Sequence, residues 1–246
     1  MVKIRQFGLL GKEIDYSFSR TYFAQKFKKE GLYNCRYNNF DLPDAAAVAK
    51  LLTTKKFAGL NVTIPYKEEV IPHLDALDPV AAKIGAVNTL CWKSGELRGY
   101  NTDAIGFEKA LKEVWQGFHE RALILGTGGA SKAIAYVFEK NNIEYLWASR
   151  KASNPQQITY QEIDKGFIQK YTLIVNSTPL GTFPQVETCP ELPYQSLGPE
   201  HCLFDLVYNP ENTTFMQHGL RQKATVSNGY QMLVYQAEAA WEIWNS

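Results

Sequence analysis

Apolar and polar residues alternate along this chain with two periods, one typical of strands and one typical of helices. In the first hundred residues we expect strands over Lys3–Leu10, Asn34–Phe40 and around Leu60, helices over Ser19–Glu30 and Pro43–Thr54, and a hairpin of Ala86–Trp92 with Leu97–Tyr100. Strands that alternate with helices predict an α/β protein with a mostly parallel sheet.

The rest of the chain repeats this alternation as a second unit. We expect its first helix from Asp103 to about Trp115, a last helix from about Gly229 to Trp244, and strands over Arg121–Leu125, Tyr145–Ala148, Leu173–Asn176, Leu203–Leu206 and Ala224–Val226. A glycine-rich turn directly follows the first of these strands and precedes a helix. That order of elements is typical of a Rossmann-like dinucleotide-binding sheet.

One segment of the first unit combines a strand end with a lysine. Polar and apolar residues alternate from Asn61 to Ile64, so a strand would direct Asn61 and Thr63 to one face and the two apolar side chains to the other. The proline that follows ends the strand and favours a helix start. Lys67 then lies in the first helical turn, where the helix dipole disfavours a cation. It is either an exposed surface lysine or part of a site.

Composition excludes several classes of function. The 246 residues include 26 basic and 25 acidic ones, so the net charge of +1 gives no broad basic face for nucleic acid. No apolar run approaches the ~20 residues of a membrane span, and the N-terminus lacks the apolar core of a signal peptide, so we expect a cytoplasmic protein. The four cysteines are widely spaced and the histidines scattered, which predicts reduced core thiols and no metal site.

The glycine-rich turn is the candidate cofactor site. In Gly126-Thr127-Gly128-Gly129-Ala130 the glycines allow a tight turn and expose amide hydrogens at a helix N-terminus, where a pyrophosphate binds. The turn departs from the G-x-G-x-x-G pattern because Gly129 directly follows Gly128. A strand-to-helix turn without a ligand is the alternative.

The end of the next strand favours NADP over NAD. An NAD site would have an acidic residue there, about twenty residues past the turn, to bind the ribose 2′-hydroxyl. This chain has Ser149-Arg150-Lys151 instead. A guanidinium binds a 2′-phosphate with two hydrogen bonds and stacks on adenine. A solvated basic turn is the other interpretation.

A nicotinamide also needs a group that manages the proton as the hydride moves. Asp103, in the segment Tyr100–Phe107, is a candidate carboxylate. It lies where a helix N-cap is expected, and the two roles can coexist.

Eight segments, in order along nearly the whole chain, resemble the shikimate dehydrogenase family. They are Ser17–Ser19, Asn61–Lys67, Gly85–Leu90, Gly99–Asp103, the glycine-rich turn, Asn176–Gly181, Phe204–Pro210 and Gly229–Ala237. The resemblance implies reversible NADPH-dependent reduction of 3-dehydroshikimate to shikimate, a step toward chorismate and the aromatic amino acids. It implies a two-lobed α/β fold, with a substrate-binding domain of residues 1–102 and 229–246 and a Rossmann-like NADP-binding domain of residues 103–228. We expect a monomer or homodimer.

The resemblance also assigns site residues by motif position. Lys67 and Asp103 match the catalytic pair. The implied substrate contacts are Ser17, Ser19, Thr63, Asn88, Tyr208 and Gln236. The implied cofactor contacts are Gly126, Thr127, Gly128, Gly129, Ala130, Ser149, Arg150, Lys151, Thr178, Gly229 and Met232.

These assignments suit the chemistry of the implied substrate, a small ring with a carboxylate and three hydroxyls that needs polar partners. An ammonium at Lys67 could stabilise or protonate the carbonyl oxygen that gains charge, and Asp103 would orient it. Local roles compete: the two serines could cap a helix, Asn88 could end a strand, and Gln236 could be a polar spot on the last helix.

The chain departs from the family pattern at three places. Tyr16 and Arg20 flank the first serine motif, where histidine and proline are usual. The basic turn replaces Asn-Arg-Thr, and Thr127 replaces alanine. The nearest alternative function is a quinate/shikimate dehydrogenase with relaxed or NAD specificity. A non-catalytic NADP-binding module is a second alternative, although such a module needs neither Lys67 nor Asp103.

Overall fold

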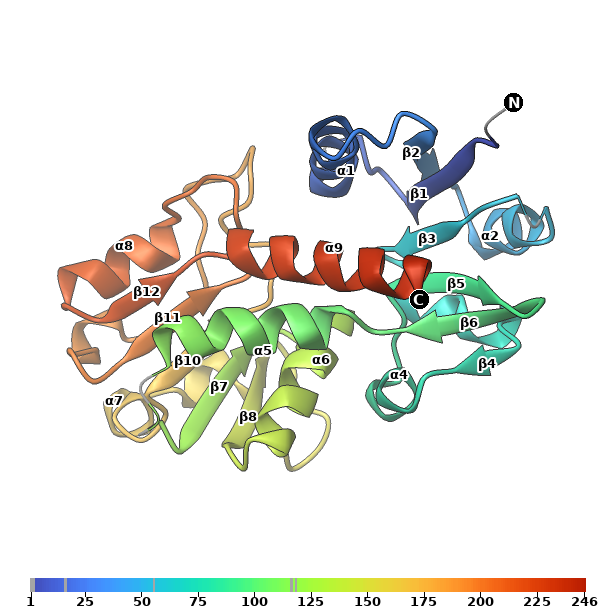
Figure 1. Cartoon of the computed structure of the whole chain (residues 1–246). Helices are drawn as coiled ribbons and strands as arrows, with labels where there is room; N and C mark the ends of the chain where they lie inside the picture. Colours follow the sequence, from blue (N-terminus) through green and yellow to red (C-terminus); the bar gives the residue numbers. More distant parts are fainter. Residues whose placement is uncertain (1–2, 16, 55, 116, 118) are drawn as a thin grey trace. The chain divides into compact units, whose positions relative to one another are not determined.

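The computed structural model describes residues 3–15, 17–54, 56–115, 117 and 119–246. The chain splits into two compact units, one within Met1–Ile105 and Gln236–Ser246 and the other within Gly106–Tyr235 (Figure 1). The last helix, α9 (Tyr230–Asn245), therefore contributes residues to both units. Tyr16, one of the departures from the family pattern, lies outside the described residues.

The first unit is built on a six-stranded sheet with the order β2-β1-β3-β5-β6-β4. Its strands are β1 (Arg5–Gly11), β2 (Cys35–Asp41), β3 (Gly59–Val62), β4 (Ala76–Leu77), β5 (Thr89–Lys93) and β6 (Glu96–Tyr100), and its helices are α1 (Phe18–Lys29), α2 (Ala45–Leu52), α3 (Tyr66–Glu69) and α4 (Pro79–Ile84). β1 pairs in parallel with β2 and β3, and β5 pairs antiparallel with β3 and β6. The predicted hairpin is confirmed, and its turn residues Ser94 and Gly95 both have the positive φ (52° and 88°) of a type I′ turn.

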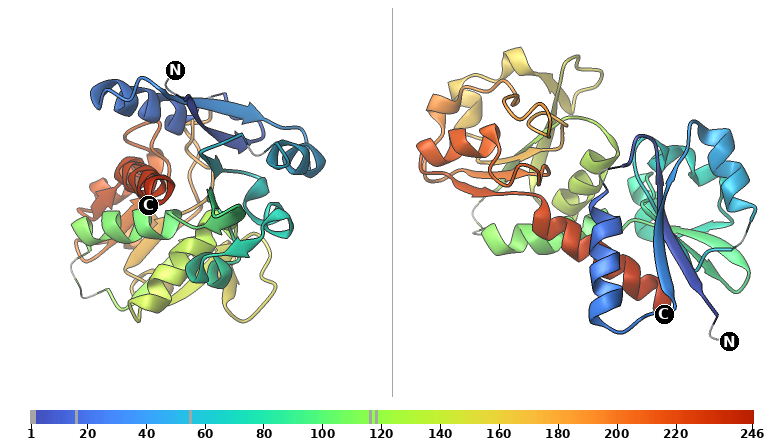
Figure 2. Two further views of the ribbon diagram at one scale, coloured as in Figure 1. Left: turned by 45° about the vertical axis from the view of Figure 1, so that its right-hand side comes forward. Right: turned by 90° about the horizontal axis from the view of Figure 1, so that it is seen from above.

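The C-terminal part of α9 completes the core of this unit. Trp244 packs against Phe7 and Phe23, with ring centroids 5.0 and 5.4 Å away, and its indole nitrogen donates to Leu90 O at 3.0 Å. The ring also covers Gly59, where a Cβ atom would lie 2.2 Å from it. α9 lies beside α1 in the same region, where Lys26 of α1 forms an ion pair with Glu238 (Figure 2). Only glycine at position 59 leaves room for this packing.

The strand that carries the site is shorter than the alternation predicted. Val62 is buried, as expected, at 2% exposure, whereas Ile64 is 74% exposed. The expectation that these two side chains share a face is therefore wrong, because β3 ends at Val62 and the period of two ends with it.

The second unit is a fully parallel sheet with the order β12-β11-β10-β7-β8-β9. Its strands are β7 (Arg121–Leu125), β8 (Glu144–Ser149), β9 (Gln157–Thr159), β10 (Leu173–Asn176), β11 (Cys202–Asp205) and β12 (Thr225–Ser227), and its helices are α5 (Asp103–Val114, shared at its start with the first unit), α6 (Gly129–Lys140), α7 (Lys165–Ile168) and α8 (Thr214–Arg221). This is the doubly wound dinucleotide-binding order, which reverses between β7 and β10. The Rossmann-like prediction is confirmed.

All four cysteines are free thiols. Cys35, Cys91 and Cys202 are buried, as expected, whereas Cys189 is only partly buried at the edge of the second core. None of the described helices combines the length and apolar character needed to span a membrane.

Candidate functional site

Lys67 and Asp103 form an ion pair. The Nζ atom of Lys67 lies 2.7 Å from Oδ2 of Asp103, and the side chains are only 15% and 10% exposed. Lys67 is in the four-residue helix α3, just after β3, and Asp103 is the first residue of α5. A partly buried contact of this length is a strong, charge-assisted hydrogen bond.

Asn88 fixes the second oxygen of this carboxylate. Its Nδ2 atom donates to Asp103 Oδ1 at 2.8 Å and to Thr102 Oγ1 at 2.9 Å, and its Oδ1 atom accepts from the Thr102 backbone N–H at 2.7 Å. Both oxygens of Asp103 are therefore held, one by a cation and one by an amide. Asp103 is not the N-cap of α5, because it lies inside the helix and Asn101 Oδ1 accepts from Ala104 N at 3.2 Å.

The other expected substrate residues of the first unit are Gln236, Ser17, Ser19 and Thr63. Gln236, buried in α9, accepts a 3.5 Å hydrogen bond from Thr102 and so belongs to the same network. Ser17 is the N-cap of α1 and accepts from Arg20 N at 3.3 Å, whereas Ser19 lies inside that helix. Thr63 is half-buried just past β3, and its methyl group lies over Gly11, where a Cβ atom would come within 2.5 Å of it.

Sequence reasoning missed a buried polar chain behind Asn88. The Tyr37 hydroxyl donates to Asn61 Oδ1 at 2.7 Å, and Asn61 Nδ2 donates to Asn88 O and Thr89 Oγ1, both at 3.2 Å. Burial raises the pKa of Tyr37. The only signal in the sequence was Asn61, a polar residue in a strand whose four positions are all buried.

The glycine-rich turn lies at the point where the strand order of the second sheet reverses. Gly126 has a φ of 98°, and a Cβ atom there would lie 3.0 Å from the Thr178 methyl group. Ser177 donates to Leu125 O through both its backbone N–H and its hydroxyl, at 3.0 and 2.6 Å. The turn after β7 and the loop after β10 are thus packed together, and only a residue without a Cβ fits easily at position 126.

The start of α6 remains open. Gly128 is the N-cap and supplies no capping side chain, and a Cβ atom there would meet nothing within 4 Å. Thr127 is exposed, and Gly129 and Ala130 are half-buried in the first turn of the helix. The free amides of a helix N-terminus and the helix dipole attract an anion to such a place.

The basic turn follows β8 at the same edge of the sheet. Ser149 ends the strand, and its hydroxyl donates to Lys151 O at 2.7 Å, while Arg150 and Lys151 are exposed. Burial raises the pKa of the neighbouring Tyr160, and the charge of Arg150 partly offsets that rise. The exposed side chain of Arg150 leaves its charge available to solvent or a ligand.

The remaining expected contacts lie in the C-terminal part of the second unit. A Cβ atom at Gly229 would lie 2.1 Å from Leu206 O, so no other residue fits there without moving the backbone. Met232 is buried in α9. Tyr208 is half-buried after β11, and burial raises its pKa.

A buried carboxylate joins the ends of two central strands in this unit. Asp205 Oδ1 accepts from Asn176 Nδ2 at 2.9 Å and from Val207 N at 3.0 Å, and Oδ2 accepts from the Thr213 hydroxyl at 2.6 Å. Despite these three hydrogen bonds, desolvation raises the pKa of Asp205 to about 6. Asn176 in turn accepts from Thr178, so the network supports the loop that packs on Gly126.

The raised pKa of Asp205 makes the stability of the protein depend on pH in a specific window. The folded state holds this proton up to about pH 6, whereas the unfolded chain releases it near 3.8, so stability attributable to Asp205 falls as pH rises between these values. The expected fall is about 3 kcal/mol. We expect Asp205→Asn to abolish this component, which urea unfolding of both proteins from pH 4 to 7 measures. A constant difference in unfolding free energy across that range would contradict the assignment.

Among the described residues, no group of three or more histidine, cysteine or acidic side chains is placed to hold a metal ion. The residues around Lys67 and Asp103 offer a lysine, a carboxylate and neutral polar groups.

A doubly wound sheet with an open glycine turn and a unit with a partly buried lysine–carboxylate pair define a dinucleotide-dependent α/β protein of the dehydrogenase class. A family model described as the shikimate dehydrogenase substrate binding domain matches residues 9–90. The NADP(+) shikimate dehydrogenase of Moorella thermoacetica is 38% identical over 259 aligned residues, which cover 96% of this chain and 86% of that protein. The chain therefore belongs to the shikimate dehydrogenase family.

Two solved structures bear on specificity. Shikimate 5-dehydrogenase from Thermus thermophilus, in complex with NADP(H) and shikimate, is 31% identical with a TM-score of 0.84, over 98% of this chain and 93% of that one. Quinate dehydrogenase from Corynebacterium glutamicum, in complex with NAD, is 25% identical with a TM-score of 0.88, over 98% and 94%. The fold is thus shared by enzymes named for either substrate.

Proposed function

We propose that this protein is an NADP-dependent shikimate dehydrogenase, which reversibly reduces 3-dehydroshikimate to shikimate in the biosynthesis of chorismate and the aromatic amino acids. The observation that carries the proposal is the ion pair of Lys67 with Asp103, held by Asn88. The substrate-binding domain comprises residues 1–102 and 229–246, and residues 103–228 bind NADP. We further propose that it acts in the cytoplasm as a monomer or homodimer.

Lys67 is the proposed proton donor. The hydride comes from the nicotinamide when NADPH is bound, and negative charge develops on the substrate carbonyl oxygen. The Lys67 ammonium stabilises that oxygen and donates a proton to it, and in the reverse direction Lys67 accepts the proton of the alcohol. Asp103 Oδ2 holds the ammonium in place, and the bond of Asn88 to Oδ1 keeps the carboxylate from rotating.

The proposed substrate contacts provide hydroxyl and amide groups for a ring with a carboxylate and several hydroxyls. They are Ser17, Ser19, Thr63, Asn88, Tyr208 and Gln236. The network that ties Gln236 and Asn88 through Thr102 supports this assignment, because it holds two of these side chains in fixed orientations.

The proposed cofactor contacts follow the edge of the second sheet. Gly126–Ala130 present the open N-terminus of α6 to the pyrophosphate, and Ser149, Arg150 and Lys151 bind the 2′-phosphate. Thr178, Gly229 and Met232 complete the cofactor site, with Gly229 and Met232 beside the nicotinamide. NADP is favoured by the exposed guanidinium of Arg150 at the end of β8.

A quinate/shikimate dehydrogenase that uses NAD is the second candidate, which the likeness to the quinate enzyme favours. A spectrophotometric matrix of shikimate and quinate against NADP and NAD separates the two. We expect the highest kcat/KM for shikimate with NADP. A higher value for quinate with NAD would establish the alternative, and no oxidation in any combination would indicate a non-catalytic NADP-binding module.

Replacing Arg150 by alanine tests the cofactor assignment. Since the guanidinium would pair with a phosphate that only NADP carries, we expect the KM for NADP to rise roughly 10- to 30-fold, the low end for a lost charge partner at an exposed site. The KM for NAD should change less than about twofold, because its ribose lacks that phosphate. Arg221→Ala, which removes an exposed arginine of α8, is the matched control. Equal losses for both cofactors would show that Arg150 does not bind the 2′-phosphate.

A further inference from the structure

We propose that Tyr37 is a positioning residue that anchors the polar network behind Asn88 and thereby sets how the first unit presents the Asn88 side chain to the substrate. The inference rests on the proposed function, and it adds a residue that makes none of the proposed substrate contacts itself.

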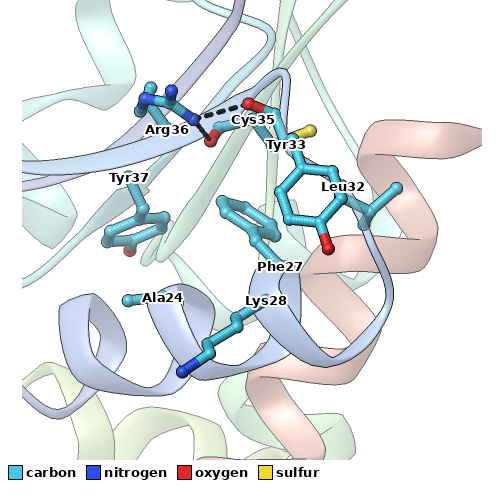
Figure 3. Close-up of a pocket in the computed structure, with 8 residues that line it drawn as sticks. All are labelled: Ala24, Phe27, Lys28, Leu32, Tyr33, Cys35, Arg36 and Tyr37. Atoms are coloured by element: carbon cyan, nitrogen blue, oxygen red, sulfur yellow. Dashed lines mark hydrogen bonds between the residues drawn. The ribbon is translucent and has the colours of Figure 1, made fainter.

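Tyr37 lies between a surface hollow and the buried network. Its ring stacks on Phe23 with centroids 4.6 Å apart and borders a hollow of about 300 Å³, together with Ala24 and Phe27 (Figure 3). Its hydroxyl donates to Asn61 Oδ1 at 2.7 Å. Tyr37 thus joins α1, through its ring, to Asn61 of β3, through its hydroxyl.

Hydrogen-bond chemistry assigns a direction to each of these contacts. Asn88 O is a carbonyl oxygen and can only accept, so the Asn61 amide nitrogen must face it, at 3.2 Å. The Asn61 oxygen then faces Tyr37, which must donate its single proton to it.

The same chain of contacts reaches the catalytic pair. The Asn88 carbonyl that Asn61 binds also accepts from Val62 N at 2.8 Å, which fixes the backbone of Asn88 against β3. The Asn88 side chain in turn holds Asp103. Loss of the Tyr37 hydroxyl would leave the Asn61 oxygen without its donor, while the stacked ring would remain.

Tyr37→Phe in the full-length enzyme tests the inference. We expect the KM for shikimate to rise about fivefold, as for the loss of one typical hydrogen bond, with kcat changed less than about threefold and the KM for NADP unchanged. The matched control is Tyr194→Phe, which removes another buried tyrosine hydroxyl, bonded to Pro190 O at 2.6 Å in the second unit. We expect that control to lower thermal stability by a similar amount and to leave every KM unchanged.

A double-mutant cycle separates positioning from a purely structural role. If Tyr37 acts through Asn88, Tyr37→Phe should raise the KM for shikimate by less than about twofold in an Asn88→Ala background, so the two effects should not multiply. Multiplicative effects, or an unchanged KM for shikimate in Tyr37→Phe, would overturn the inference. The proposed function would still stand in that case, provided that the wild-type enzyme is active. A wild type that neither oxidises shikimate nor binds it in calorimetry would overturn both.

Discussion

Replacing Lys67 by alanine is expected to lower kcat about a thousandfold, within the range found for general acid–base groups. The ammonium is 2.7 Å from a carboxylate and largely buried, so water cannot easily reproduce a cation held in this position. Since the interaction strengthens only as charge develops on the carbonyl oxygen, the KM for shikimate should stay within about threefold of the wild type. Steady-state kinetics in both directions measure this split.

Two controls test whether a loss of activity comes from the missing ammonium or from a loss of folding. Lys67→Ala leaves Asp103 without its cation, so thermal unfolding must show that the variant is folded at the assay temperature. Lys50→Ala removes an exposed lysine of α2 in the same unit and should retain full activity. Near-normal turnover in a folded Lys67→Ala enzyme would refute the catalytic assignment.

Asp103→Asn is expected to lower kcat about a hundredfold although the side chain keeps its shape. Asn88 donates to one oxygen of Asp103 and Lys67 to the other. An amide at position 103 can accept from only one of these donors through its oxygen, so its NH₂ group must face either Asn88 or the ammonium. Lys67 would lose its charged partner and its fixed position. A catalytic group that is no longer held in the reactive geometry lowers the rate of the chemical step.

The double variant sharpens this expectation. If the two residues act as one unit, Lys67→Ala with Asp103→Asn should be about as slow as Lys67→Ala alone, rather than slower by the product of both losses. Asp75→Asn is the control, because Asp75 accepts from Leu97 N in the same unit and lies outside the proposed site. Independent, multiplicative losses would mean that Asp103 does not act through Lys67.

The regular elements of both units could be predicted because their cores impose a period on the sequence. β10 begins and ends at the predicted residues, Leu173 and Asn176, since the apolar run of a central parallel strand is covered on both faces. The shortest elements, such as β4 and β9, have two and three residues and therefore no period to detect. The glycine turn was predictable because strand, turn and helix are adjacent in the chain.

The site was predictable only in part, because its pieces are distant in sequence. Lys67 and Asp103 were identified from motif position, but their contact spans 36 residues and depends on how β3, β5 and β6 pair. Tyr37 was missed because a single polar tip on an otherwise buried aromatic ring resembles ordinary core packing. Ile64 was placed wrongly because alternation does not reveal where a strand stops.

The packing of Trp244 over Gly59 has a consequence for the order of events on the ribosome. Domains generally fold as they emerge, the N-terminal one first. Here the first unit lacks part of its core until Gln236–Ser246 have been synthesised, whereas the second unit, Gly106–Tyr235, is continuous in the chain. The half of the protein that is translated first is therefore the half that is completed last, and its apolar surface around Gly59 stays uncovered while the whole cofactor-binding half is made.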